Sequence, residues 1–150
     1  MQERVNLGKA GPDLYQAMLA LEGQLQPALA AAGIDKGFSH LLRLRASQIN
    51  QCAFCVRMHA RDALAAGETQ DRISVLPAWR ETGYFSDLER AALELVESVT
   101  LVATDQVPDA VYARVAAVLS QDQIAAVAWL GVVINAWNRI AIASRYPVNP

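Results

Sequence analysis

The chain has 150 residues, of which 53% are hydrophobic and 19% charged, and its formal net charge is −2. This composition excludes an intrinsically disordered chain, and the length predicts a single domain, residues 1–150, with a sizeable core. The sequence has no run of lysine or arginine, so nucleic acid is not an expected partner.

The N-terminal part of the chain predicts two helices. Apolar side chains repeat at helical spacing from Leu14 to Leu25. Gly33 is placed to end this helix, and Pro27 is expected to kink it or to split it in two. Asp35 follows as an N-cap for the second helix, because its short carboxylate can accept a hydrogen bond from the first turn.

The remaining helices are indicated by their start and stop signals. We expect a third helix that Asn50 caps and Gly67 ends, and then a short helix over residues 70–76. Later helix starts are indicated by two capping boxes and one proline: Ser86 with Glu89, Ser120 with Gln123, and Pro108. No segment alternates as a strand does, so the sequence predicts an all-α bundle of six or seven helices.

The most apolar stretch runs from Ile124 to Ile142. Its second half contains Asn135, Asn138 and Arg139, whereas a bilayer span needs about 20 apolar residues. We therefore expect a buried central helix and no association with a membrane. The N-terminus lacks the apolar core of a secretory signal, so the expected compartment is the cytoplasm. The apolar excess also predicts contacts between copies of the chain.

All cysteines and histidines of the protein lie within twenty residues: His40, Cys52, Cys55 and His59. On a helix, Cys52 and Cys55 are three residues apart and Cys55 and His59 four, so both pairs are neighbours on one face. Such a cysteine pair can close a disulfide with modest adjustment. In a reducing compartment, a lone C-x-x-C is more often redox-active or metal-binding than a structural disulfide.

This arrangement favours thiol chemistry. The N-terminal end of the helix carries partial positive charge, which favours a thiolate near Cys52. His59 can take a proton from Cys55 and then stabilise the thiolate as an imidazolium. A thiolate attacks the O–O bond of a peroxide, and a second cysteine then converts the resulting sulfenic acid to a disulfide, which an outside reductant must reopen.

Three other interpretations remain. Together with His40 and His59, the cysteines would make a two-cysteine, two-histidine set that suits zinc, although three ligands on one helical face would be unusual geometry. The protein could instead sense redox state, or act in an assembly, without turnover. Finally, the cysteines could be inert core residues, and His40 taken alone is most simply a partly buried helix histidine.

The segment from Leu44 to His59, LRASQINQCAFCVRMH, resembles the core motif of the alkylhydroperoxidase D-like family, within the carboxymuconolactone decarboxylase-like superfamily. Similar segments extend the resemblance over most of residues 14–146: residues 65–69, 78–80, 85–92 and 134–139. The resemblance implies an all-helical trimer or hexamer that reduces hydroperoxides with a dithiol reductant, lipoyl-linked in the best-known branch. We expect no cofactor and no resident metal. The decarboxylase branch lacks the cysteine pair.

The resemblance also assigns roles by position. Cys55 is implied to attack the peroxide, Cys52 to resolve the sulfenic acid, and His59 to act as the base. One departure concerns the proton relay: His40 stands where the family usually carries a glutamate that serves the histidine. We expect His40 to lie near His59 and to lower its pKa by like-charge repulsion. Gln51 likewise stands where glycine is common.

Overall fold

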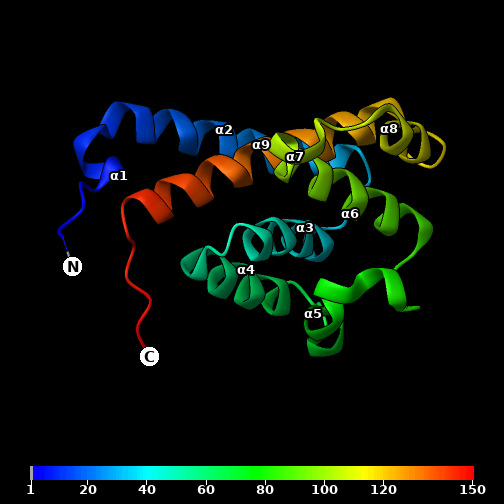
Figure 1. Cartoon of the computed structure of the whole chain (residues 1–150), viewed down its shortest axis with the longest axis horizontal. Helices are drawn as coiled ribbons and strands as arrows, with labels where there is room; N and C mark the ends of the chain where they lie inside the picture. The colour runs from blue at the N-terminus through cyan, green and yellow to red at the C-terminus, as the bar shows by residue number, and fades with distance from the viewer. Residues whose placement is uncertain (1) are drawn as a thin grey trace.

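The computed structural model describes residues 2–150, and over this range the chain is helical, without a strand (Figure 1). Nine α-helices and one 3-10 helix follow one another in this part of the chain: α1 (Leu7–Ala10), α2 (Pro12–Ala31), α3 (Lys36–Ile49), α4 (Ala53–Ala65), α5 (Gln70–Val75), η1 (Leu76–Glu81), α6 (Asp87–Thr100), α7 (Val102–Asp105), α8 (Asp109–Ala116) and α9 (Gln121–Ala143). The predicted all-α class is confirmed.

The local capping signals place most helices as predicted. Asp35 accepts from the Phe38 N–H at the start of α3, and α2 ends just before Gly33, whose φ is 78°. Ser86 and Ser120 both form complete capping boxes, at the starts of α6 and α9. Seven of the α-helices correspond to predicted ones, whereas α1, η1 and α7 are additional short segments that were not predicted.

One prediction at a helix end is wrong, and one alternative at Pro27 is excluded. α2 runs through Pro27 as one helix, which excludes the split and leaves the kink as the expectation. Asn50 does not cap α4: it ends α3, where its N–H donates to the Ala46 carbonyl, and the cap of α4 is Cys52. Asparagine suits either end of a helix, so residue type alone did not decide between the two.

α3 lies at the centre of the molecule. It contacts α2, α4, α6, α9 and η1, and most of its side chains are buried. Figure 1 shows α3 and α4 side by side on one side of α9, with α2 on the other side. Since His40 belongs to α3 and His59 to the adjacent α4, this central packing places the two histidines between the same two helices.

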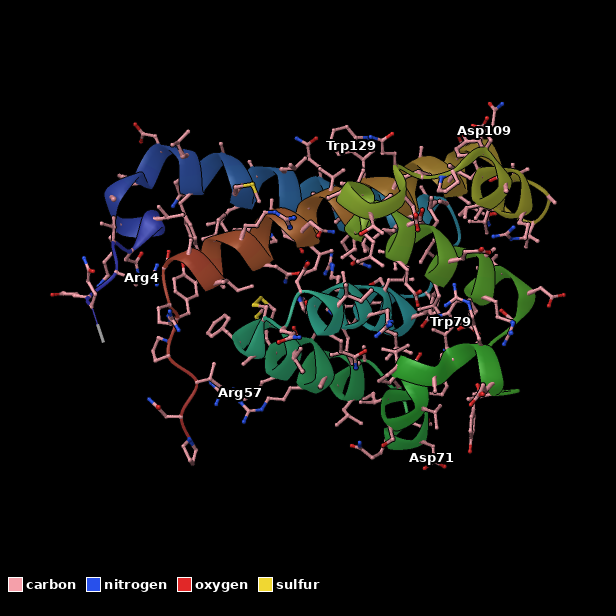
Figure 2. The ribbon with its side chains drawn as sticks, viewed as in Figure 1. Arg4, Arg57, Asp71, Trp79, Asp109 and Trp129 are labelled. Atoms are coloured by element: carbon pink, nitrogen blue, oxygen red, sulfur yellow. A yellow bond between two sulfur atoms is a disulfide. The ribbon has the colours of Figure 1, made fainter. Side chains whose placement is uncertain are left out.

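α9 is only partly the buried central helix that the sequence predicts. Asn138 is fully buried, but Trp129 is 55% exposed and points away from the bundle (Figure 2). α9 is long and apolar enough to cross a membrane by length and composition, yet half of its apolar window is buried inside the molecule. That burial is typical of a core helix in a soluble fold, so the helix does not indicate a membrane span.

A network of side-chain amides ties the end of α3 to α9. The Asn50 side-chain amide donates to the side-chain oxygens of Asn135 (2.9 Å) and Asn138 (2.8 Å). Asn138 in turn donates to the Ser47 hydroxyl, and Asn135 to the Thr100 hydroxyl on α6. Polar side chains inside a core need such partners, so these asparagines join α3, α6 and α9. The network fixes the α3–α4 turn that precedes Cys52.

Candidate functional site

The cysteine pair is positioned by a tight turn between α3 and α4. Gln51 adopts a left-handed conformation, with φ of 56°, between the last residue of α3 and the cap of α4. Cys52 is extended, and its sulfur accepts a hydrogen bond from the Cys55 N–H at 3.4 Å. Glycine adopts such a φ without strain, which is a physical reason for glycine to be common at this position in similar sequences.

Cys52 and Cys55 lie at disulfide distance and are joined, with their Cα atoms 5.3 Å apart. Cys52 is the cap of α4 and Cys55 lies in its first turn, where unpaired backbone N–H groups favour negative charge. The sulfur that is released when the disulfide opens therefore lies where a thiolate is stabilised. Both cysteines are only 2% exposed.

A small pocket of about 270 Å³ opens beside Cys52. Its walls are mainly apolar and come from the start of α4, the end of α9 and the C-terminal segment: Gln51, Cys52, Ala53, Phe54, Ala141, Ile142, Arg145, Tyr146 and Val148. Cys52 lines this pocket, whereas Cys55 faces the interior. A molecule in this pocket therefore meets the sulfur of Cys52 and not that of Cys55.

The C-terminal segment closes one side of this pocket. The Tyr146 ring packs edge-on against Phe54, with ring centroids 5.2 Å apart. The Arg57 guanidinium donates to the Asn149 carbonyl at 2.7 Å, and Figure 2 shows the Arg57 side chain extending from α4 toward this segment. The segment makes access to Cys52 narrow.

His40 and His59 face each other across the α3–α4 interface. Their rings are stacked, with centroids 5.8 Å apart and planes inclined by 29°. His40 is 9% exposed and His59 6%, and the Nδ1 atom of each ring has no hydrogen-bond partner among the described residues. The expectation that His40 lies near His59 is confirmed.

Burial lowers the pKa of both histidines. It is the largest cause for His59, whose pKa falls from 6.5 to about 3, followed by the positive charge of Arg43 and only then by His40. The pKa of His40 is also lowered, first by burial and then by Arg43. His40 therefore acts on His59 in the predicted direction, but it is not the main cause. The structure makes His59 a neutral imidazole near neutral pH.

Arg43 and Asp62 are the charged groups of this site that the sequence analysis did not identify. Arg43 is 5% exposed and forms an ion pair with Glu22 of α2 at 2.9 Å. One carboxylate oxygen of Asp62 and one nitrogen from each of His40 and His59 all lie within 4.8 Å of one another. Asp62 follows His59 by three residues on one helix, so the sequence alone could have indicated that the two are neighbours. The contribution of Arg43 depends on how α3 packs and could not be predicted in this way.

The two-cysteine, two-histidine zinc hypothesis does not fit the oxidised form. The sulfurs of Cys52 and Cys55 are bonded to each other, and the potential ligand atoms that converge in the described chain belong to His40, His59 and Asp62. The structure thus separates the predicted residues into a sulfur pair at the pocket and a histidine pair between α3 and α4. His59 connects the two, one helical turn after Cys55.

Several known proteins are similar to this chain in sequence. Residues 12–98 match the carboxymuconolactone decarboxylase family. The uncharacterized protein YdfG of Bacillus subtilis is 38% identical over 143 residues, which are 95% of each chain. The uncharacterized protein YnjA of Escherichia coli is 32% identical over 84 residues, which are 56% of this chain and 46% of that protein.

A solved structure extends the likeness to the fold. The crystal structure of ATU0492 from Agrobacterium tumefaciens, a protein of unknown function, superposes with a TM-score of 0.87 and 37% sequence identity. The match covers 99% of this chain and 100% of that one. The description of that protein suggests an antioxidant defence role as an AhpD. The arrangement of helices is therefore shared along nearly the whole chain.

Proposed function

The chain belongs to the carboxymuconolactone decarboxylase family, with an alkylhydroperoxidase D-like fold, and on this premise we propose that it is a thiol-dependent hydroperoxide reductase. The observation that carries the proposal is the Cys52–Cys55 pair at disulfide distance at the start of α4, with His59 one turn further along the same helix. The family name covers decarboxylases as well, but a cysteine pair that can open and close supports two-electron thiol chemistry.

The oxidative half of the proposed cycle uses both thiols. His59 accepts the Cys55 proton, and the thiolate attacks the terminal oxygen of the hydroperoxide: an S–O bond forms, the O–O bond breaks, and the alkoxide leaves as the alcohol after taking a proton. The Cys52 sulfur then attacks the sulfenic acid, and hydroxide leaves as water with the second thiol proton. Two thiols and one hydroperoxide thus give one disulfide, one alcohol and one water.

The reductive half needs a dithiol partner, for which a lipoyl-linked group is the chemistry we propose. A reductant thiolate attacks Cys52, because this sulfur lines the pocket, and the Cys55 thiolate leaves into the first turn of α4. The second thiol of the reductant then attacks the mixed disulfide and releases Cys52. The mainly apolar walls of the pocket suit an uncharged dithiol chain better than a charged thiol such as glutathione.

Catalytic turnover tests this proposal. We expect the protein to consume cumene hydroperoxide continuously when dihydrolipoamide is supplied, with one dihydrolipoamide oxidised per hydroperoxide. Oxidation that stops after one disulfide per chain with every dithiol tried would instead support the redox-sensing alternative. Metal analysis of the reduced protein addresses the zinc alternative, because tightly bound stoichiometric zinc would occupy the thiols.

Replacing His40 by glutamate should accelerate the reaction of Cys55 with hydroperoxide at neutral pH, by about tenfold for about 1.4 kcal/mol of added charge interaction. His40 now disfavours the protonated form of His59, whereas the new carboxylate would favour it. The positive charge of Arg43 would compensate the burial of that carboxylate. The measurement is the second-order rate of thiol oxidation against pH. His40→Gln is the matched control, since it adds no charge, and an unchanged pH profile in His40→Glu would leave His40 as a packing residue.

We also propose that the chain works in the cytoplasm as a homotrimer or homohexamer. The support is apolar surface along α9 and α2, where Trp129 is 55% exposed and a cavity of about 460 Å³ lies between the two helices. Exposed apolar patches of this kind are typical of contacts between protein copies. Light scattering that gave a mass near 16.3 kDa at working concentrations would reject the oligomer.

A further inference from the structure

A carboxylate lies beside the histidine pair, although residue 40 is not acidic. Asp62 belongs to α4, is partly exposed, and approaches the nitrogens of both His40 and His59 to within 4.8 Å. Within residues 2–150, its carboxylate makes no ion pair with a lysine or arginine. Its negative charge is therefore available to the two imidazoles.

We propose that Asp62 is the carboxylate of the proton relay that serves Cys55, and that it acts through His40. The proposal rests on the proposed thiol chemistry. In space, Asp62 takes the role that a glutamate at position 40 would have, but from the neighbouring helix. His59, His40 and Asp62 form a compact cluster between α3 and α4, and Asp62 is its most exposed member. In this account Asp62 is a positioning residue, since it touches neither the sulfurs nor the substrate.

The need for such a carboxylate follows from the environment of His59. Its pKa of about 3 means that a proton taken from a thiol, whose ordinary pKa is about 8.5, does not remain on His59. The adjacent proton acceptor is His40, whose pKa is lowered by burial and raised by Asp62. The proton is thus better held on His40, where a carboxylate compensates the charge and the edge of the site is closer to water.

The charges around His40 come from three helices, and Asp62 acts against the larger lowering of the His40 pKa by burial and by Arg43. The groups that face it are Arg43 and Lys36 on α3, Asp62 and His59 on α4, and Glu22 on α2. Arg43 and Lys36 lower the pKa of His40, whereas Asp62 and Glu22 raise it. Since Glu22 is already committed to the ion pair with Arg43, Asp62 is the anion that remains to favour protonated His40.

The relay and a simple field effect predict opposite signs at Cys55. If Asp62 acts only as a nearby negative charge, its removal stabilises the thiolate and makes Cys55 more reactive at neutral pH. If Asp62 holds a proton on the histidine pair, its removal takes away the positive charge that stabilises the thiolate, and Cys55 becomes less reactive. The sign of the change therefore distinguishes the two accounts.

The experiment is alkylation of Cys55 by iodoacetamide against pH in a Cys52→Ser background, where Cys55 is the sole thiol. We expect Asp62→Asn to slow alkylation at pH 7 by about tenfold, which is less than the roughly 10²–10⁴-fold of a direct general acid or base, because Asp62 acts through His40. The rates should converge above the pKa of the thiol. Asp62→Glu should restore most of the rate, and Glu81→Gln, which removes an exposed carboxylate elsewhere, should change nothing.

A second readout needs no thiol reactivity. In the oxidised full-length protein, nitrogen NMR of labelled histidine should show a lower pKa for His40 in Asp62→Asn than in the parent, and the spectrum also reports whether the variant is folded. An unchanged His40 titration, or faster alkylation at neutral pH, would overturn the proposal. A zinc ion would also overturn it, if the parent bound one zinc per chain, Asp62→Asn lost that zinc, and the loss explained the change in alkylation rate.

These outcomes are separable from those of the proposed function. Alkylation and histidine titration use no hydroperoxide, so the Asp62 relay is decided even if the protein reduces none. Conversely, hydroperoxide turnover that is unaffected in Asp62→Asn would leave the proposed function standing and reject the relay.

Discussion

Replacing Cys55 by serine should abolish hydroperoxide reduction, with a loss of at least about a thousandfold, because the attacking nucleophile is removed. Serine preserves the size of the side chain in the first turn of α4, so the fold should be retained. Replacing Cys52 by serine should have a different result. One equivalent of hydroperoxide is still consumed, but the reaction stops at the Cys55 sulfenic acid, because no thiol is left to close the disulfide.

The two variants are best compared in a single turnover. The reduced proteins are mixed with one equivalent of hydroperoxide, and the alcohol product is measured together with the mass of the protein. One added oxygen on Cys52→Ser, and none on Cys55→Ser, is the expected pattern. The reverse pattern would exchange the roles of the two cysteines, and equal activity in both variants would place the chemistry elsewhere.

Acid should destabilise the protein through His59 well before most carboxylates titrate. The unfolded chain takes up a proton near pH 6.5, whereas the buried imidazole resists it to about pH 3. The neutral ring therefore contributes stability above pH 6.5 that is lost as the pH falls toward 3. This difference in pKa lowers the free energy of unfolding by about 5 kcal/mol when the ring is fully protonated, and by about 2 kcal/mol between pH 7 and pH 5. His40 adds to the loss in the same direction.

Urea unfolding of the oxidised protein at pH 7, 6 and 5 measures this loss. The matched variant is His59→Gln, whose side chain is polar but does not titrate. It is expected to lower the free energy of unfolding at pH 7 and to flatten the pH dependence between pH 7 and pH 5. A wild-type protein whose stability is constant over that range would contradict a neutral, buried His59.

The fold was predictable where local signals decide the structure. Ser86 and Ser120 carry complete capping boxes, and both helices begin there, because a capping box satisfies backbone donors within one turn. At Asn50, the choice between ending one helix and starting the next depends on the amide network with α9 and on the left-handed Gln51. Both of these are tertiary features, so residue type alone gave the wrong cap.

The candidate site was predictable in part for the same reason. Spacing along one helix brings Cys55 and His59 together, and the resemblance to a known family pointed to His40. Arg43 contributes through its burial and its charge, and Asp62 through the packing of α4 on α3. Tyr146 lies beyond the end of the last helix, and no sequence pattern places it against Phe54. Groups that meet across elements become visible only when the elements are packed.

The most direct test of the central claim is a stoichiometric single turnover of the reduced wild-type protein. One equivalent of cumene hydroperoxide is added without any external reductant, and the alcohol and the free thiols are counted. The proposed chemistry predicts one alcohol formed and two thiols lost per chain, with the mass lower by two hydrogens and the bridge joining Cys52 to Cys55. Unconsumed hydroperoxide with both thiols intact would contradict it.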